Sequence, residues 1–126
     1  MGLINIQAFR AIAEKDFEFN REMRYFDGRI RIDVGDGERH VMEFKDGCLV
    51  NISDVDVPRA DCKIYLKGTQ EQWSEMLQRF PRPFFHSIQS TCVKHGMLIS
   101  DSNETFAYLP ALNRMMQILR NVHNKE

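Results

Sequence analysis

The sequence predicts an α+β domain in which a single layer of about five mostly antiparallel strands is covered on one face by helices. The middle of the chain alternates apolar and polar residues with a period of two, which is typical of strands that bury one face. Both flanks instead space their apolar residues three and four apart, as amphipathic helices do. Neighbouring antiparallel strands with one apolar face need a cover, and these helices are the available one.

The first helix is predicted over residues 5–18. Its apolar residues fall on one helical face, and they are Ile6, Phe9, Ile12, Ala13 and Phe17. Charged residues lie elsewhere on the helix, among them Arg10, Glu14, Lys15 and Glu18, so this helix should pack one side against the sheet.

Three strands are predicted to follow as a meander. Residues 29–34 and 40–45 alternate around the turn Gly35-Asp36-Gly37 and form a hairpin. Asp46-Gly47 is a favoured dipeptide for a tight turn at positive φ, and residues 48–52 continue as the third strand. A polar stretch with a proline interrupts the ladder before the fourth strand, residues 62–67.

Two helices are predicted after the fourth strand. Thr69 and Gln72 have the spacing of a capping box, which starts a helix that should bury Trp73, Met76, Leu77 and Phe80. Pro81 and Pro83 break that helix. Helical spacing then resumes at Phe84, Phe85, Ile88 and Cys92, and Gly96 is the expected C-cap.

The last elements are a short strand and a long helix. Residues 97–100 should join the edge of the sheet. The closing helix has Pro110 in its first turn and an apolar stripe made of Leu112, Met115, Met116, Leu119 and Val122.

Composition limits the classes of function. A chain of 126 residues is the size of one domain, spanning residues 1–126, and its net charge of −1 argues against a nucleic-acid partner. Its apolar runs fall short of a membrane span, so stable membrane insertion is not expected. The 3 cysteines are an odd set without a Cys-x-x-Cys pair, which favours a reducing compartment, and we expect the protein to be cytoplasmic.

Several local motifs resemble the sterol carrier protein type-two (SCP-2-like) domain, over about residues 17–122. They are Phe44-Lys45-Asp46-Gly47, Ala60-Asp61-Cys62-Lys63-Ile64 running into Lys67-Gly68-Thr69 and Trp73, and Gly96-Met97-Leu98-Ile99-Ser100-Asp101. The resemblance implies a hydrophobic tunnel between sheet and helices that holds a sterol, a fatty acyl chain or another lipid. It also implies that some such domains work beside an enzyme and present substrates to it.

Ten apolar helix residues are the candidates to line such a tunnel, although ordinary core packing is the commoner role of each, because a helix stripe needs packing with or without a cavity. They are Trp73, Met76, Phe80, Phe84, Phe85, Ile88, Leu112, Met115, Met116 and Leu119. Methionine suits a pocket that must adapt to varied apolar shapes.

No metal, cofactor or catalytic residue is predicted. Cys92, His95 and His86 lack the further pair of ligands that a metal site needs. Ser87, Ser90, Cys92, His86 and Asp101 are close in sequence, but no strained nucleophile turn such as Gly-x-Ser-x-Gly accompanies them.

Three hypotheses therefore remain, in this order. The first is a module that binds an apolar small molecule. The second is an accessory subunit that docks to an enzyme partner of lipid, steroid or aromatic metabolism. The third is a small hydrolase or isomerase, for which His86 would be the first catalytic candidate.

Overall fold

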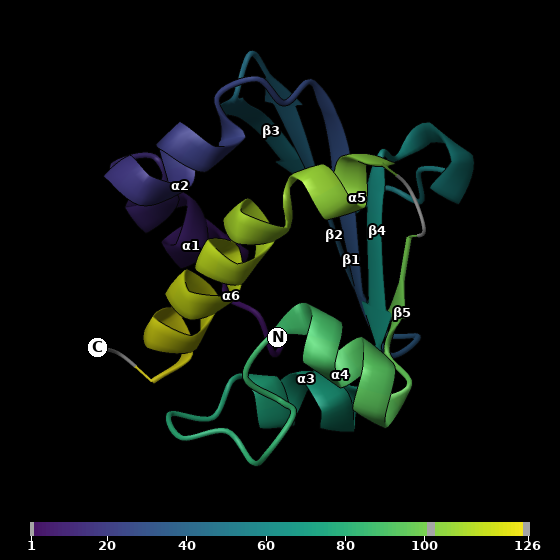
Figure 1. The fold of residues 1–126 in the computed structure, drawn as a ribbon. Helices are drawn as coiled ribbons and strands as arrows, with labels where there is room; N and C mark the ends of the chain where they lie inside the picture. The colour runs from purple at the N-terminus through teal and green to yellow at the C-terminus, as the bar shows by residue number, and fades with distance from the viewer. Residues whose placement is uncertain (1, 101–102, 125–126) are drawn as a thin grey trace.

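A computed structural model describes residues 2–100 and 103–124 of the chain. Five strands form one mixed sheet in the order β3-β2-β1-β4-β5, and the helices gather on one side of it (Figure 1). The predicted α+β class, with its mostly antiparallel sheet, is confirmed. The strands are β1 Gly28–Val34, β2 Glu38–Lys45, β3 Cys48–Ser53, β4 Ile64–Gly68 and β5 Leu98–Ile99.

The predicted first helix is in fact two helices, α1 Ile6–Ala13 and α2 Phe17–Met23. Asp16 breaks it, because its carboxylate accepts from the Phe19 amide as an N-cap. The Asn20 amide group donates to the carbonyl oxygens of Ala13, Glu14 and Asp16, which satisfies the backbone groups left over at the break. The apolar residues from Ile6 to Phe17 keep helical spacing across Asp16, so the sequence pattern gave no sign of this break.

The β1–β2–β3 meander is confirmed, and both of its turns lie where the sequence placed them. Asp46 and Gly47 adopt φ angles of 51° and 81°, as the tight hairpin turn requires. Gly47 also packs against the preceding loop so closely that an added Cβ would lie 2.5 Å from Arg24 Cα.

The fourth strand corrects the expected topology. β4 pairs with β1 and runs parallel to it, so the four neighbouring strands are not all antiparallel. The chain leaves β3 at the sheet edge and crosses to the far side of β1 in the polar loop 54–63. Arg39 and Arg31 hold that loop by donating to the carbonyl oxygens of Asp54, at 2.8 Å, and Val57, at 2.6 Å.

The helices after β4 are shorter than predicted. α3 Gln70–Met76 starts with the capping box formed by Thr69 and Gln72, but it ends before Phe80. α4 Ile88–His95 starts at the Ser87 cap, which leaves Phe84 and Phe85 in the connecting loop. Gly96 ends α4 with a φ of 75°, the C-cap predicted for it.

The remaining elements complete the cover. β5 pairs antiparallel with β4 at the sheet edge, as expected. A short helix that the sequence did not predict, α5 Asn103–Ala107, precedes α6 Leu109–His123. Asp101, named in the sequence motifs, lies outside the described residues. α6 packs against both α1 and α2, and the core lies between these helices and the sheet (Figure 1).

Candidate functional site

The ten residues predicted to line a tunnel fall into two groups. Eight are buried in the single core cluster on the helix-covered face, and they are Trp73, Met76, Phe85, Ile88, Leu112, Met115, Met116 and Leu119. Phe80 and Phe84 instead lie on the surface, with 83% and 50% of their area exposed. Neither of the cavities described below is lined by any of the ten.

An apolar cavity of about 250 Å³ lies beside this core, between the α1–α2 corner and the β2–β3 turn. Phe19 and Phe44 line it side by side, with ring centroids 6.3 Å apart, and Ala13 forms part of its α1 wall. Glu14, Asn20, Gly47, Cys48 and Leu49 complete the lining. The cavity therefore lies between the helices and the sheet, on the side where an apolar ligand was expected.

The core next to this cavity is rich in methionine. Every methionine of the chain after the first residue is buried, with at most 2% of its area exposed: Met23, Met42, Met76, Met97, Met115 and Met116. Methionine has an unbranched, flexible side chain, so a core built from it can change shape at a lower cost than one built from β-branched residues.

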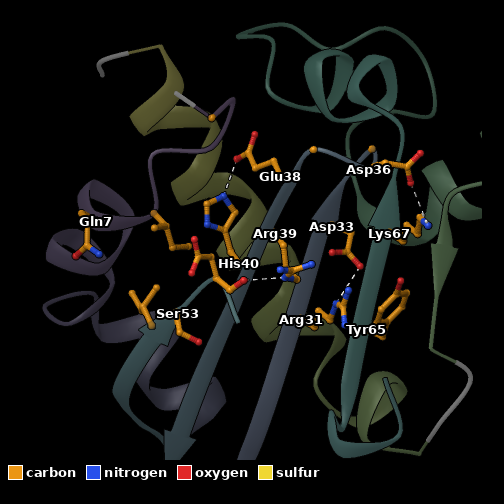
Figure 2. Close-up of a pocket in the computed structure, with 16 residues that line it drawn as sticks. Gln7, Arg31, Asp33, Asp36, Glu38, Arg39, His40, Ser53, Tyr65 and Lys67 are labelled. Carbon is orange, nitrogen blue, oxygen red and sulfur yellow. Dashed lines mark hydrogen bonds and ion pairs between the residues drawn. The ribbon is translucent and has the colours of Figure 1, made fainter. Parts of the chain in front are cut away.

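A larger hollow of about 800 Å³ extends over the open face of the sheet and around the β1–β2 turn (Figure 2). Most of its lining is charged or polar. At its centre Arg31 Nε lies 3.0 Å from Asp33 Oδ2, and Arg31 Nη1 lies 2.9 Å from Asp56 Oδ1. Tyr65 lies beside them, with its ring centroid 5.6 Å from the Arg31 guanidinium carbon.

This polar cluster is fixed to the core beneath it. The Trp73 indole donates to the backbone oxygen of Asp33 at 3.0 Å, so a buried tryptophan of α3 supports the strand that carries the cluster. Burial, followed by a hydrogen bond to Asp33, raises the pKa of Tyr65. Burial likewise raises the pKa of the Cys62 thiol, so neither group is an activated nucleophile near neutral pH.

The rim of the hollow near α1 holds the N-terminal segment. The Glu38 carboxylate accepts hydrogen bonds from the amides of Leu3 and Ile4, and His40 Nε2 lies 2.6 Å from it. Burial raises the pKa of Glu38, but these hydrogen bonds outweigh it and leave the pKa below its ordinary value. Figure 2 shows Glu38 and His40 on the side of the hollow toward α1.

Of the residues considered for catalysis, the four that the structure describes line neither cavity. His86 is exposed and lines neither cavity, while Ser87 and Ser90 are hydrogen-bonded to each other at the start of α4. Within residues 2–100 and 103–124 there is no group of three or more histidine, cysteine or acidic residues that could hold a metal ion. None of the helices in that part of the chain has the length and apolar character needed to cross a bilayer.

The fold closely matches a crystal structure of sterol carrier protein 2. The TM-score is 0.69 at 14% sequence identity, and the match covers 90% of this chain and 92% of the other. The chain has the sterol carrier protein 2 fold. A solution structure of a conserved hypothetical protein from Thermus thermophilus, named as a candidate sterol carrier protein, matches with a TM-score of 0.65 at 14% identity, over 92% of this chain and 84% of that one.

The likeness is one of structure and not of sequence. No family model matches the sequence, and no curated protein matches it. The resemblance read from short motifs is thus confirmed at the level of the fold. A structural match at 14% identity shows the fold of this chain and does not show its ligand. The ligand is therefore proposed below from the residues of this chain.

Sequence reasoning missed the residues around the apolar cavity. Phe19 was not included because the first helix was predicted to end at residue 18, whereas α2 continues to Met23. Phe44 and Leu49 were recognised only as strand residues. The turn between them, Asp46-Gly47, was the available signal, because it brings both strand ends to the same corner of the sheet.

Proposed function

We propose that this protein binds an apolar small molecule, such as a sterol, a fatty acyl chain or another lipid, between the sheet and the helices. It would act as a carrier or would present its ligand to an enzyme. The observation that carries the proposal is the apolar cavity at the α1–α2 corner, which adjoins a methionine-rich core within a sterol carrier fold. Burial of apolar surface would supply the binding energy.

The cavity would be the mouth of the site and the core its interior. A volume of about 250 Å³ is smaller than most sites for ligands of drug size, which are roughly 300 Å³ or more. A longer ligand would therefore need to displace side chains of the adjoining core. Met115 and Met116 of α6, which packs on α1 and α2, are suited to that movement.

The eight buried residues from the predicted lining, from Trp73 on α3 to Leu119 on α6, would surround the deeper part of such a ligand. An acyl chain that buries roughly 300 Å² of apolar surface would gain about 7 kcal/mol before the costs of ordering are subtracted. Without those costs this gain would correspond to a dissociation constant of roughly 10 μM, so the measured binding should be weaker than that. Because ion pairing contributes little, the affinity should barely change between low and moderate salt.

A pair of matched substitutions tests the location. Ala13→Leu adds a side chain to the wall of the apolar cavity and should fill it, with little loss of stability and weaker binding of a fluorescent fatty acid. Ala111→Leu makes the same change at an equally buried alanine that lines neither cavity. It should overpack the core, at a cost of about 1 to 3 kcal/mol.

The two readouts separate the possible results. Selective loss of binding in Ala13→Leu supports the site. Unchanged binding in Ala13→Leu, or equal destabilisation by both exchanges, would reject it. Organic extraction of protein purified without detergent, followed by mass spectrometry, would then identify the ligand class.

A role as an accessory subunit is the second candidate. The observation that favours it is the polar hollow on the open face, which the helices leave uncovered. Substitution of Arg31, which holds both Asp33 and the loop 54–63, should then weaken an enzyme complex without affecting fatty acid binding. Co-purification with an enzyme, lost in Arg31→Ala, is the measurement.

A further inference from the structure

The apolar cavity at the α1–α2 corner has a buried end and a solvent-exposed end. Phe19 and Phe44 line the buried end, next to the apolar core. Glu14 and Cys48 are exposed, so they mark the end that opens to solvent, and Asn20 is the remaining polar lining residue. A polar head group buried without a hydrogen-bond partner is costly. A lipid in this cavity would therefore point its chain inward and leave its head group at the solvent-exposed end.

The stronger hydrogen-bond donors at the solvent-exposed end are already in use. The Asn20 side-chain amide donates to three backbone carbonyl oxygens at the break between α1 and α2, over 2.9 to 3.2 Å. The Gly47 amide donates to the carbonyl oxygen of Phe26 at 2.9 Å. The Cys48 thiol is only a weak donor. An ionised carboxylate can accept hydrogen bonds but cannot donate them, so this end offers it little in exchange for its bonds to water.

The charge at the solvent-exposed end is negative. Glu14 is the one charged residue among the described residues that line the cavity, and its side chain is 49% exposed. Arg10, one helical turn earlier, compensates part of this charge, with its Nε 2.8 Å from Glu14 Oε1. Arg10 does not itself line the cavity. In the part of the chain that the structure describes, this pair involves Oε1 alone, so Glu14 Oε2 is available to accept a further hydrogen bond.

We propose that Glu14 selects apolar ligands whose head group is an uncharged hydroxyl over ligands with an ionised carboxylate. This inference rests on the proposed function and names the class of ligand for the same cavity. A ligand hydroxyl donates to the Glu14 carboxylate, whereas a ligand carboxylate meets a like charge. Because Glu14 is half-exposed, water screens this repulsion. A fatty acid therefore still binds through its chain, with lower affinity than the matched alcohol.

Dodecanol and dodecanoate, which share one chain length, test this selection. Each is titrated at neutral pH against protein loaded with Nile red, an uncharged fluorescent dye, and displacement of the dye gives its dissociation constant. The measured quantity is the preference ratio, the dissociation constant of dodecanoate divided by that of dodecanol. Any apolar site favours the alcohol to some extent, so the decisive result is how the ratio changes in variants.

Glu14→Gln keeps an oxygen that accepts, removes the negative charge and adds an amide donor for a carboxylate. It should lower the preference ratio about fivefold, roughly the difference between a hydrogen bond to a charged acceptor and one to a neutral acceptor. Arg10→Gln should instead raise the ratio about twofold, because Glu14 then lacks its compensating partner.

The matched control is Glu22→Gln, which removes an acid that is paired with Arg21 on α2 and lines neither cavity. It should leave the preference ratio unchanged. An unchanged ratio in Glu14→Gln would overturn the inference, as would an equal fall in Glu22→Gln, which would indicate an effect of net charge. Both results leave the proposed function standing. Failure of both ligands to displace the dye from the wild type would reject the proposed function, and this inference with it.

Discussion

A half-buried ion pair joins Asp16, the N-cap of α2, to Arg114 of α6, and its contribution to the free energy of unfolding can be measured by mutation. Asp16 caps α2 through the Phe19 amide, and its two carboxylate oxygens accept from Arg114 of α6 at 2.7 and 3.0 Å. Only 14% of the Asp16 side chain and 27% of the Arg114 side chain are exposed. We therefore expect replacement of Asp16 to destabilise the protein through two separable losses, that of the ion pair and that of the helix cap.

The two losses can be assigned magnitudes. Asparagine at this position would keep an N-cap oxygen and lose the charge, so Asp16→Asn should cost only the bidentate pair, about 1 to 1.5 kcal/mol. Asp16→Ala loses the cap as well and should cost about 2 to 3 kcal/mol. For a domain of this size, each kcal/mol lowers Tm by about 4 °C. Asn5→Ala, which removes the α1 cap alone, should cost about 1 kcal/mol.

Urea denaturation at neutral pH measures these differences, with Arg114→Ala and the Asp16→Asn/Arg114→Ala pair completing a double-mutant cycle. The cycle should give a favourable coupling of about 1 kcal/mol between the two side chains. An Asp16→Asn variant as stable as the wild type would show that the ion pair contributes nothing. Equal losses in Asp16→Ala and Asn5→Ala would lead to the same conclusion.

Three further predictions concern acid, backbone strain and metal. The pKa of Asp16 is lowered chiefly by its hydrogen bond from Arg114, and that of Glu38 by hydrogen bonds that outweigh burial, so the folded state holds these protons less tightly than the unfolded state. The stabilisation from these two carboxylates is complete above their pKa values in the unfolded chain, which are near 4, and is lost as pH falls through the lower pKa values of the folded state. The urea midpoint should therefore be lower at about pH 3 than at about pH 6. Gly47→Ala should cost at least about 2 kcal/mol, since the new Cβ would meet backbone atoms at positive φ, whereas Gly37→Ala, with open space around it, should be nearly neutral by thermal denaturation. Zinc chelators should leave Tm unchanged, and a drop of several degrees would reveal a metal site.

The strands and caps of this fold could be predicted because each depends on nearby residues. Asp46-Gly47 determines its own turn, and Thr69 with Gln72 starts α3 without help from distant parts of the chain. The parallel pairing of β4 with β1 could not be predicted in this way. The loop 54–63 that carries the chain from β3 to β4 is held by Arg31 and Arg39, and these contacts join residues far apart in sequence.

The candidate site was only partly predictable for a related reason. Helical spacing correctly indicated that Trp73 and Met116 would be buried, because burial of a stripe follows from the pattern itself. The same spacing failed for Phe80 and Phe84, since α3 ends at Met76 and a positive φ turns Phe84 outward. Which buried residues adjoin a cavity depends on how helices meet, and periodicity carries no such information.

The place of β1 between β2 and β4 governs how the chain can fold during biosynthesis. The hairpin β1–β2 can form once the first 45 residues have been made, but the other side of β1 stays unpaired until β4, residues 64–68, is available. α1 and α2 wait longer still, because α6, which packs on both, begins only at Leu109. The nascent chain therefore leaves one edge of β1 unpaired until residue 68 has been made, and it leaves the faces of α1 and α2 that contact α6 uncovered for longer, which is when aggregation is the greater risk.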